Sequence, residues 1–169
     1  MYDVNVVTSA IKMDCGPTCL KMLLDYYGIE VDLDTLIREC NTRIEGCSGK
    51  DLKRVGNAHG LDIRAYATDA DTLIKMDRPG ICHWRHSHWV IFCGTDNGKV
   101  VIINPDRGKF HMSEGSFKMF FSGTVLFNGE PQELEPEPEF TTADIVEMLA
   151  DHEYRVCLLE LGINEEELS

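Results

Sequence analysis

The fold is decided by the stretch DCGPTCLKMLLDYYG, residues 14–28. Gly16 is an acceptable cap and Pro17 prefers the first helical position, so these residues predict the start of a helix. Gly28 ends this helix, and its apolar residues recur at helical spacing and predict one buried face: Leu20, Leu23 or Leu24, and Tyr27. Cys15 is then expected beside the unpaired N–H groups of the helix start, where thiolate, the nucleophilic form of cysteine, is favoured.

A second stretch, PGICHWRHSHWVIFCG at residues 79–94, supplies a candidate base for this cysteine. The run from His88 is strand-like, residues 96–99 (DNGK) predict a hairpin turn, and the next strand ends at Asn104. Adjacent antiparallel strands bring His88 opposite Asn104. The order Cys, His, Asn is that of papain-like enzymes, in which histidine takes the thiol proton and the amide fixes the tautomer of the imidazole.

With these three motifs the sequence resembles the bacteriocin-processing, or double-glycine, cysteine peptidases, a papain-like group. The DCGPTC block looks like the nucleophile helix of that family, and His83-Trp84 followed by His88-Trp89-Val90-Ile91 looks like its histidine strand. Asn104-Pro105 stands where the family has an acidic or amide residue before proline. The resemblance covers residues 1–128. It implies cleavage of a leader peptide after a Gly-Gly pair, with Cys15, His88 and Asn104 as catalytic residues.

The chain departs from the family at the oxyanion hole. Members carry a glutamine six residues before the nucleophile, whereas this chain has Ser9 there, and its only glutamine is Gln132. Loss of one oxyanion donor costs roughly 100- to 1,000-fold in turnover, so such an enzyme is expected to be slowed and not abolished. We therefore expect the oxyanion to be bound by the backbone N–H of Cys15, with Ser9 donating directly or through water.

Composition is that of a soluble protein in a reducing compartment. The 169 residues are 43% hydrophobic, and no apolar run approaches the ~20 residues of a membrane span. The N-terminal MYDVNVVTSA lacks the features of a signal peptide, and seven cysteines without a framework spacing fit free thiols. We expect a cytoplasmic enzyme that is not inserted in a membrane.

Acidic residues gather at the C-terminus. Residues 129–169 hold 13 of the 29 acidic side chains against one basic side chain, which leaves residues 1–128 with a net charge near zero. No basic face remains to neutralise phosphates, so nucleic acid is not an expected partner. We predict a peptidase-like domain over residues 1–128, a Pro/Glu-rich linker over 129–140 and a short helical extension over 141–169. This extension either packs on its own domain or a partner, or it occupies the substrate groove and inhibits.

The order of the predicted elements independently favours an α+β, papain-like fold with two lobes. Helices are predicted at residues 17–27, 35–40 (capped by Asp34) and 50–59, and strands at 62–67, 80–84, 88–93, 100–103 and 124–127, with short helices near 69–76 and 113–120. The helical N-terminal lobe would supply Cys15, and an antiparallel sheet in the C-terminal lobe would supply His88.

We therefore expect a stand-alone cysteine peptidase that cleaves a peptide or precursor protein, with an export transporter on a separate chain as a candidate partner. Trp84 and Trp89 are candidate walls of a narrow substrate cleft. No cofactor or metal is expected, since the cysteines and histidines lack familiar zinc spacings. Two alternatives stay open: an inactive domain that binds leader peptides without cutting them, and an acyltransferase that passes the same thioester to an amine.

Overall fold

A computed structural model describes residues 1–9, 12–42, 46–85 and 88–130. This part of the chain contains a 3₁₀ turn, η1 (Lys12–Asp14), five α-helices and six strands. The helices are α1 (Cys15–Tyr26), α2 (Leu33–Glu39), α3 (Gly49–Ala58), α4 (Ala70–Met76) and α5 (Glu114–Phe120). The strands are β1 (Ile63–Ala67), β2 (Gly80–Trp84), β3 (His88–Asp96), β4 (Lys99–Asn104), β5 (Gly108–Met112) and β6 (Phe121–Asn128).

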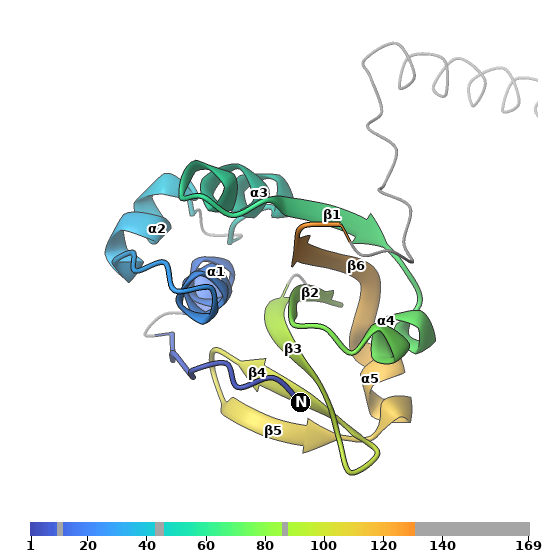
Figure 1. Cartoon of the computed structure of the whole chain (residues 1–169). Helices are drawn as coiled ribbons and strands as arrows, with labels where there is room; N and C mark the ends of the chain where they lie inside the picture. The colour runs from blue at the N-terminus through green and yellow to red at the C-terminus, as the bar shows by residue number, and fades with distance from the viewer. Residues whose placement is uncertain (10–11, 43–45, 86–87, 131–169) are drawn as a thin grey trace, which may run out of the picture. The chain divides into compact units, whose positions relative to one another are not determined.

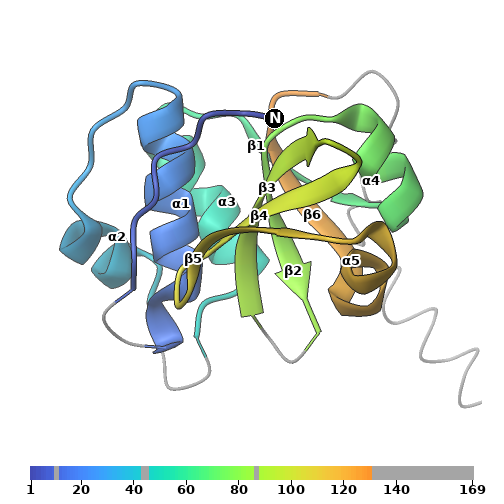
Figure 2. The same ribbon diagram turned by 90° about the horizontal axis from the view of Figure 1, so that it is seen from below.

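The six strands form one antiparallel sheet in the order β1-β6-β2-β3-β4-β5. Helices α1, α2 and α3 lie on one side of this sheet, and α4 and α5 lie on the other (Figures 1 and 2). Helices dominate the first half of the chain and strands the second. The predicted α+β, papain-like architecture is confirmed.

Alternation along the strands divides the core into two clusters. In β3, Trp89 and Ile91 pack into the cluster that holds the buried face of α1, whereas Val90 and Phe92 pack into the cluster beneath α4 and α5. Because successive side chains of a strand point to opposite faces, β3 belongs to both cores. Helix α1 is therefore fixed against the middle of the sheet.

The start of α1 differs from its prediction. The helix begins at Cys15 itself, after Asp14, which accepts no capping hydrogen bond through its side chain. Pro17 is the third helical residue and not the first. Gly28 has a left-handed backbone, as expected after a helix, but Tyr27 is 37% exposed and lies outside the buried face.

Two further elements correct the sequence reading. Helix α2 is capped by Asp32, whose carboxylate accepts from Thr35 N, so the predicted cap, Asp34, lies inside the first turn. Strand β5 was not predicted, although its Phe110 and Met112 alternate with polar residues and pack against the second core cluster; none of its five residues is fully buried. The hairpin between β3 and β4 is confirmed, with Asn97 and Gly98 both at positive φ, as a type I′ turn requires.

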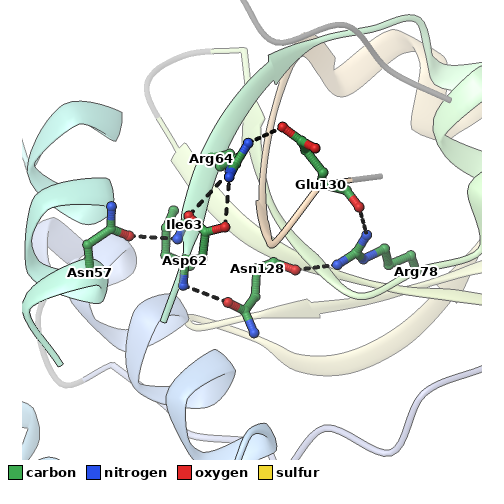
Figure 3. A network of polar contacts seen from close by, with 7 residues as sticks. All are labelled: Asn57, Asp62, Ile63, Arg64, Arg78, Asn128 and Glu130. Carbon is green, nitrogen blue, oxygen red and sulfur yellow. Dashed lines mark hydrogen bonds and ion pairs between the residues drawn. The ribbon is translucent and has the colours of Figure 1, made fainter. Parts of the chain in front are cut away.

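A polar network fastens the end of β6 to neighbouring segments (Figure 3). Asn128 Oδ1 accepts from Asp62 N at 2.8 Å, and the backbone carbonyl of Asn128 accepts from Arg78. Arg64 pairs with Asp62 and with Glu130. The network ends at Glu130, which is the last described residue. The predicted linker beyond that residue and the predicted helical extension, residues 141–169, lie outside the described residues.

Candidate active site

Cys15 lies at the N-terminal end of α1, where this helix meets β3. It is 3% exposed, and its sulfur accepts from the backbone N–H groups of Trp89 and Gly16. Strand β4 ends at Asn104, opposite Val90. The first two residues of β3, His88 and Trp89, therefore have no partner in β4. The hydrogen bond from Trp89 N–H therefore places the Cys15 sulfur beside the start of β3, next to His88.

Burial raises the pKa of the Cys15 thiol above its ordinary value, and the nearby Asp106 carboxylate adds to the rise. Hydrogen bonds from the backbone N–H groups of Trp89 and Gly16 lower the pKa, but by less. The expectation that the helix start makes this cysteine a resting thiolate is thus wrong. Removal of the sulfur from water disfavours its charge more than the backbone donors favour it. The resting group is a thiol.

His88 and Asn104 lie as the hairpin predicted. The Nε2 atom of His88 is 3.1 Å from Asn104 Oδ1, and the backbone N–H of Asp106 donates to the same oxygen at 2.9 Å. Because a backbone N–H only donates, the Asn104 atom that faces it is the oxygen. Nε2 of His88 then carries the hydrogen, and Nδ1 is the nitrogen with a free lone pair. Asn104 is 6% exposed, so this tautomer is held by a buried amide.

The backbone of Ser9 lies near the His88–Asn104 pair, because Ser9 N donates to Pro105 O at 2.9 Å. Pro105 follows Asn104 directly. The structure thus brings the segment that carries the predicted oxyanion donor to the end of β4, beside the histidine–asparagine pair.

The two predicted cleft residues occupy different environments. Trp84 is stacked on Phe120, with ring centroids 5.1 Å apart, and lies 6.4 Å from the His88 ring. Its indole N–H has no acceptor among the described residues. Trp89 is 6% exposed and packs in the core cluster of α1.

Two donors at the site were missed by sequence reasoning. The Trp89 N–H that reaches the sulfur and the Asp106 N–H that fixes the Asn104 amide both belong to the backbone. Backbone groups leave no signal in residue types. The sequence offered one indirect sign of these donors: Asn104 stands at the end of the strand that follows the hairpin turn, where backbone groups become free to bond.

The described part of the chain holds neither a cluster of metal ligands nor a membrane-spanning helix. No group of three or more His, Cys, Asp or Glu side chains there is arranged to hold a metal ion. None of the helices described has the length and apolar character needed to span a bilayer.

Residues 3–133 match the sequence model of the Peptidase C39 family. The chain belongs to this family. The match includes Cys15, His88 and Asn104 and every described element. The resemblance read from the three sequence motifs is confirmed.

Curated relatives of this C39 chain are much longer proteins. It is 28% identical over 123 residues to the colicin V secretion/processing ATP-binding protein of Escherichia coli, covering 73% of this chain and 18% of that protein. It is 29% identical over 148 residues to the LcnC-like lactococcin transport/processing ATP-binding protein of Lactococcus lactis, covering 82% of this chain and 21% of that protein. The chain thus spans about a fifth of the length of these relatives.

Solved C39 structures share the fold. A double glycine motif protease from an AMS/PCAT transporter, in complex with the leader peptide, has a TM-score of 0.71 at 24% identity, covering 79% of this chain and 92% of that one. The peptidase domain of Streptococcus ComA, a bi-functional ABC transporter involved in a quorum sensing pathway, has a TM-score of 0.69 at 23% identity, covering 80% of this chain and all of that one.

Proposed function

We propose that this C39 chain is a cysteine peptidase that removes a leader peptide from a precursor after a Gly-Gly or similar small-residue pair. The observation that carries the proposal is the contact of His88 Nε2 with Asn104 Oδ1 at 3.1 Å, beside the buried sulfur of Cys15. This contact leaves the basic nitrogen of His88 available to a thiol. Support for the substrate class comes from the relatives, which are named for processing and transport of colicin V and lactococcin.

In the proposed mechanism, Nδ1 of His88 takes the Cys15 proton as the sulfur attacks the scissile carbonyl. A resting thiol suits this role, because proton transfer then accompanies attack. The oxyanion is bound by the backbone N–H of Cys15, with Ser9 as a second donor. His88 returns its proton to the leaving amine. A water molecule, deprotonated by His88, then attacks the thioester. The Cys15 sulfur leaves and takes the proton back from His88, and the leader is released as a carboxylic acid.

Trp84 and Phe120 are proposed to form one wall of the substrate cleft. Phe120 is 42% exposed, and its neighbour Met119 is 63% exposed, so apolar surface is presented to solvent beside the aromatic stack. Trp84 links this surface to His88. We propose that apolar residues of the leader contact this surface while the small-residue pair enters the cleft.

The partner is proposed to be an export transporter, since secretion or transport accompanies processing in the names of the relatives. Cleavage is proposed to occur in the cytoplasm. The six described cysteines are free thiols, as a reducing compartment requires.

The test is incubation of the full chain with synthetic precursor peptides whose leaders end in Gly-Gly, followed by mass spectrometry. We expect a cut after the second glycine, no cut when this pair is replaced by two valines, and no cut by Cys15→Ala. A peptide that binds, by fluorescence anisotropy, but is never cut would instead support the inactive binding domain, for which the loss of glutamine at Ser9 is the best argument. A product joined to an added amine would support the acyltransferase.

A further inference from the structure

The indole of Trp89 fills the space between two helix starts. Methyl groups built on Gly16 and on Gly49 would each lie 3.2 Å from it, the first from Cδ1 and the second from Cη2. Gly16 is the second residue of α1 and Gly49 is the first of α3. A spacing of 3.2 Å is closer than ordinary van der Waals contact, so a side chain at either helix start would press on the indole.

One hydrogen bond and one ring contact hold the same side chain. The indole N–H donates to the backbone carbonyl of Cys47 at 3.1 Å, in the segment that precedes α3. On the sheet, the ring of His83 lies 4.7 Å from the indole, and Nδ1 of His83 is 2.8 Å from Ser122 Oγ. The indole is therefore fixed in orientation as well as in depth.

The backbone of the same residue meets the nucleophile, because the Trp89 N–H donates to the Cys15 sulfur. Trp89 thus contacts Cys15 through its main chain and the next residue, Gly16, through its side chain. Packed interiors resist small shifts, and reacting groups misplaced by about 1 Å lose on the order of 100-fold in rate.

We propose that Trp89 is a positioning residue: its indole sets the separation between the start of α1 and strand β3, and so holds the Cys15 sulfur within reach of His88. This role replaces the cleft wall expected from the sequence, and it rests on the proposed function. Trp89 acts from the core and does not contact substrate.

The decisive variant is Trp89→Phe, which keeps an aromatic ring but removes the indole donor and the edge that meets Gly49. The control is Phe92→Leu, a fully buried change in the same strand that faces the other core cluster. Three quantities are measured in the full chain: the melting temperature, the rate of Cys15 alkylation by iodoacetamide at pH 7, and kcat and KM for a cleaved leader peptide.

We expect Trp89→Phe to slow alkylation of Cys15 and to lower kcat by about 10- to 100-fold with KM unchanged. We expect Phe92→Leu, at an equal or larger loss of melting temperature, to change both within twofold. Gly49→Ala, which presses on the indole from α3, should also slow alkylation. The proposal is overturned if Trp89→Phe alkylates and turns over like Phe92→Leu, or if only its KM rises, as for a cleft wall.

The alkylation arm separates this proposal from the proposed function. If the wild-type chain cuts no leader peptide while Trp89→Phe and Gly49→Ala still slow alkylation, the substrate assignment fails and the positioning role stands. If the wild-type chain cuts a leader peptide but neither variant changes the rate of alkylation, the positioning role fails alone.

Discussion

At the residue scale, Asn104 is the buried amide on which the proposed chemistry depends. Its oxygen accepts from His88 and from the Asp106 backbone, and it is 6% exposed. Two donors on one buried oxygen leave no rotational freedom to the amide. The imidazole of His88 therefore keeps one tautomer whenever it is neutral.

Asn104→Ala should lower kcat by about 100-fold, because His88 then loses its orienting partner. Asn104→Asp keeps the oxygen acceptor, so we expect it to retain most of the kcat that Asn104→Ala loses. Measurement of kcat for wild type and both variants with one leader peptide checks this. An equal loss in the two variants would show that the Asn104 oxygen does not partner the base.

At the scale of elements, the junction of α1 with the segment before α3 depends on the missing side chain of Gly16. A methyl group there would overlap the Cys47 sulfur and press on Trp89. The backbone of Gly16 is ordinary helix, so alanine would otherwise be favoured at this position.

Gly16→Ala should therefore destabilise the chain by about 1–3 kcal/mol, the usual cost of overpacking. Adding Cys47→Ala removes the overlapped sulfur and should restore part of that loss. Gly115→Ala in α5 is the matched control, because nothing lies within 4 Å of its added methyl group. This control should be neutral or stabilising by up to about 1 kcal/mol. Urea unfolding of wild type and the three variants measures these differences. Equal stability of Gly16→Ala and Gly115→Ala would rule out the tight junction.

Elements with strong local signals could be predicted from the sequence, and long-range consequences could not. The α1 stretch and the Asn97-Gly98 turn gave the helix, the hairpin and so the meeting of His88 with Asn104. The edge strand β5 is short and has no fully buried residue, so its local signal is weak, and it pairs with β4. The raised pKa of Cys15 depends on burial by segments far away in sequence, which a helix-start argument does not include.

At the scale of the whole molecule, burial of thiols in the core is expected to lower the stability of the fold at alkaline pH. Burial raises the pKa of Cys93 from its ordinary 9.0 to about 12, and it also raises the pKa of Cys82. An acid whose pKa is higher in the folded state resists ionisation only while folded. Its contribution is therefore fully present below pH 9 and is lost as the pH rises toward 12.

Each such thiol should lower the free energy of unfolding by about 1.4 kcal/mol per pH unit across this window. Tyrosine and lysine also titrate there, so the useful quantity is the difference between wild type and Cys93→Ala. We expect the variant to lose less stability between pH 9 and pH 11 in urea unfolding with reductant present. Parallel curves for the two proteins would contradict the burial of this thiol.

The central claim is that Cys15 and His88 form a working pair, and alkylation of Cys15 tests it without knowledge of the substrate. The rate of reaction with iodoacetamide at pH 7 is read by peptide mass spectrometry in wild type and in His88→Ala. Cys47, half-buried and close to Gly16, is the internal reference. We expect Cys15 to react faster than Cys47 in wild type and to lose this advantage in His88→Ala. A Cys15 that reacts no faster than Cys47, with or without His88, would contradict the claim.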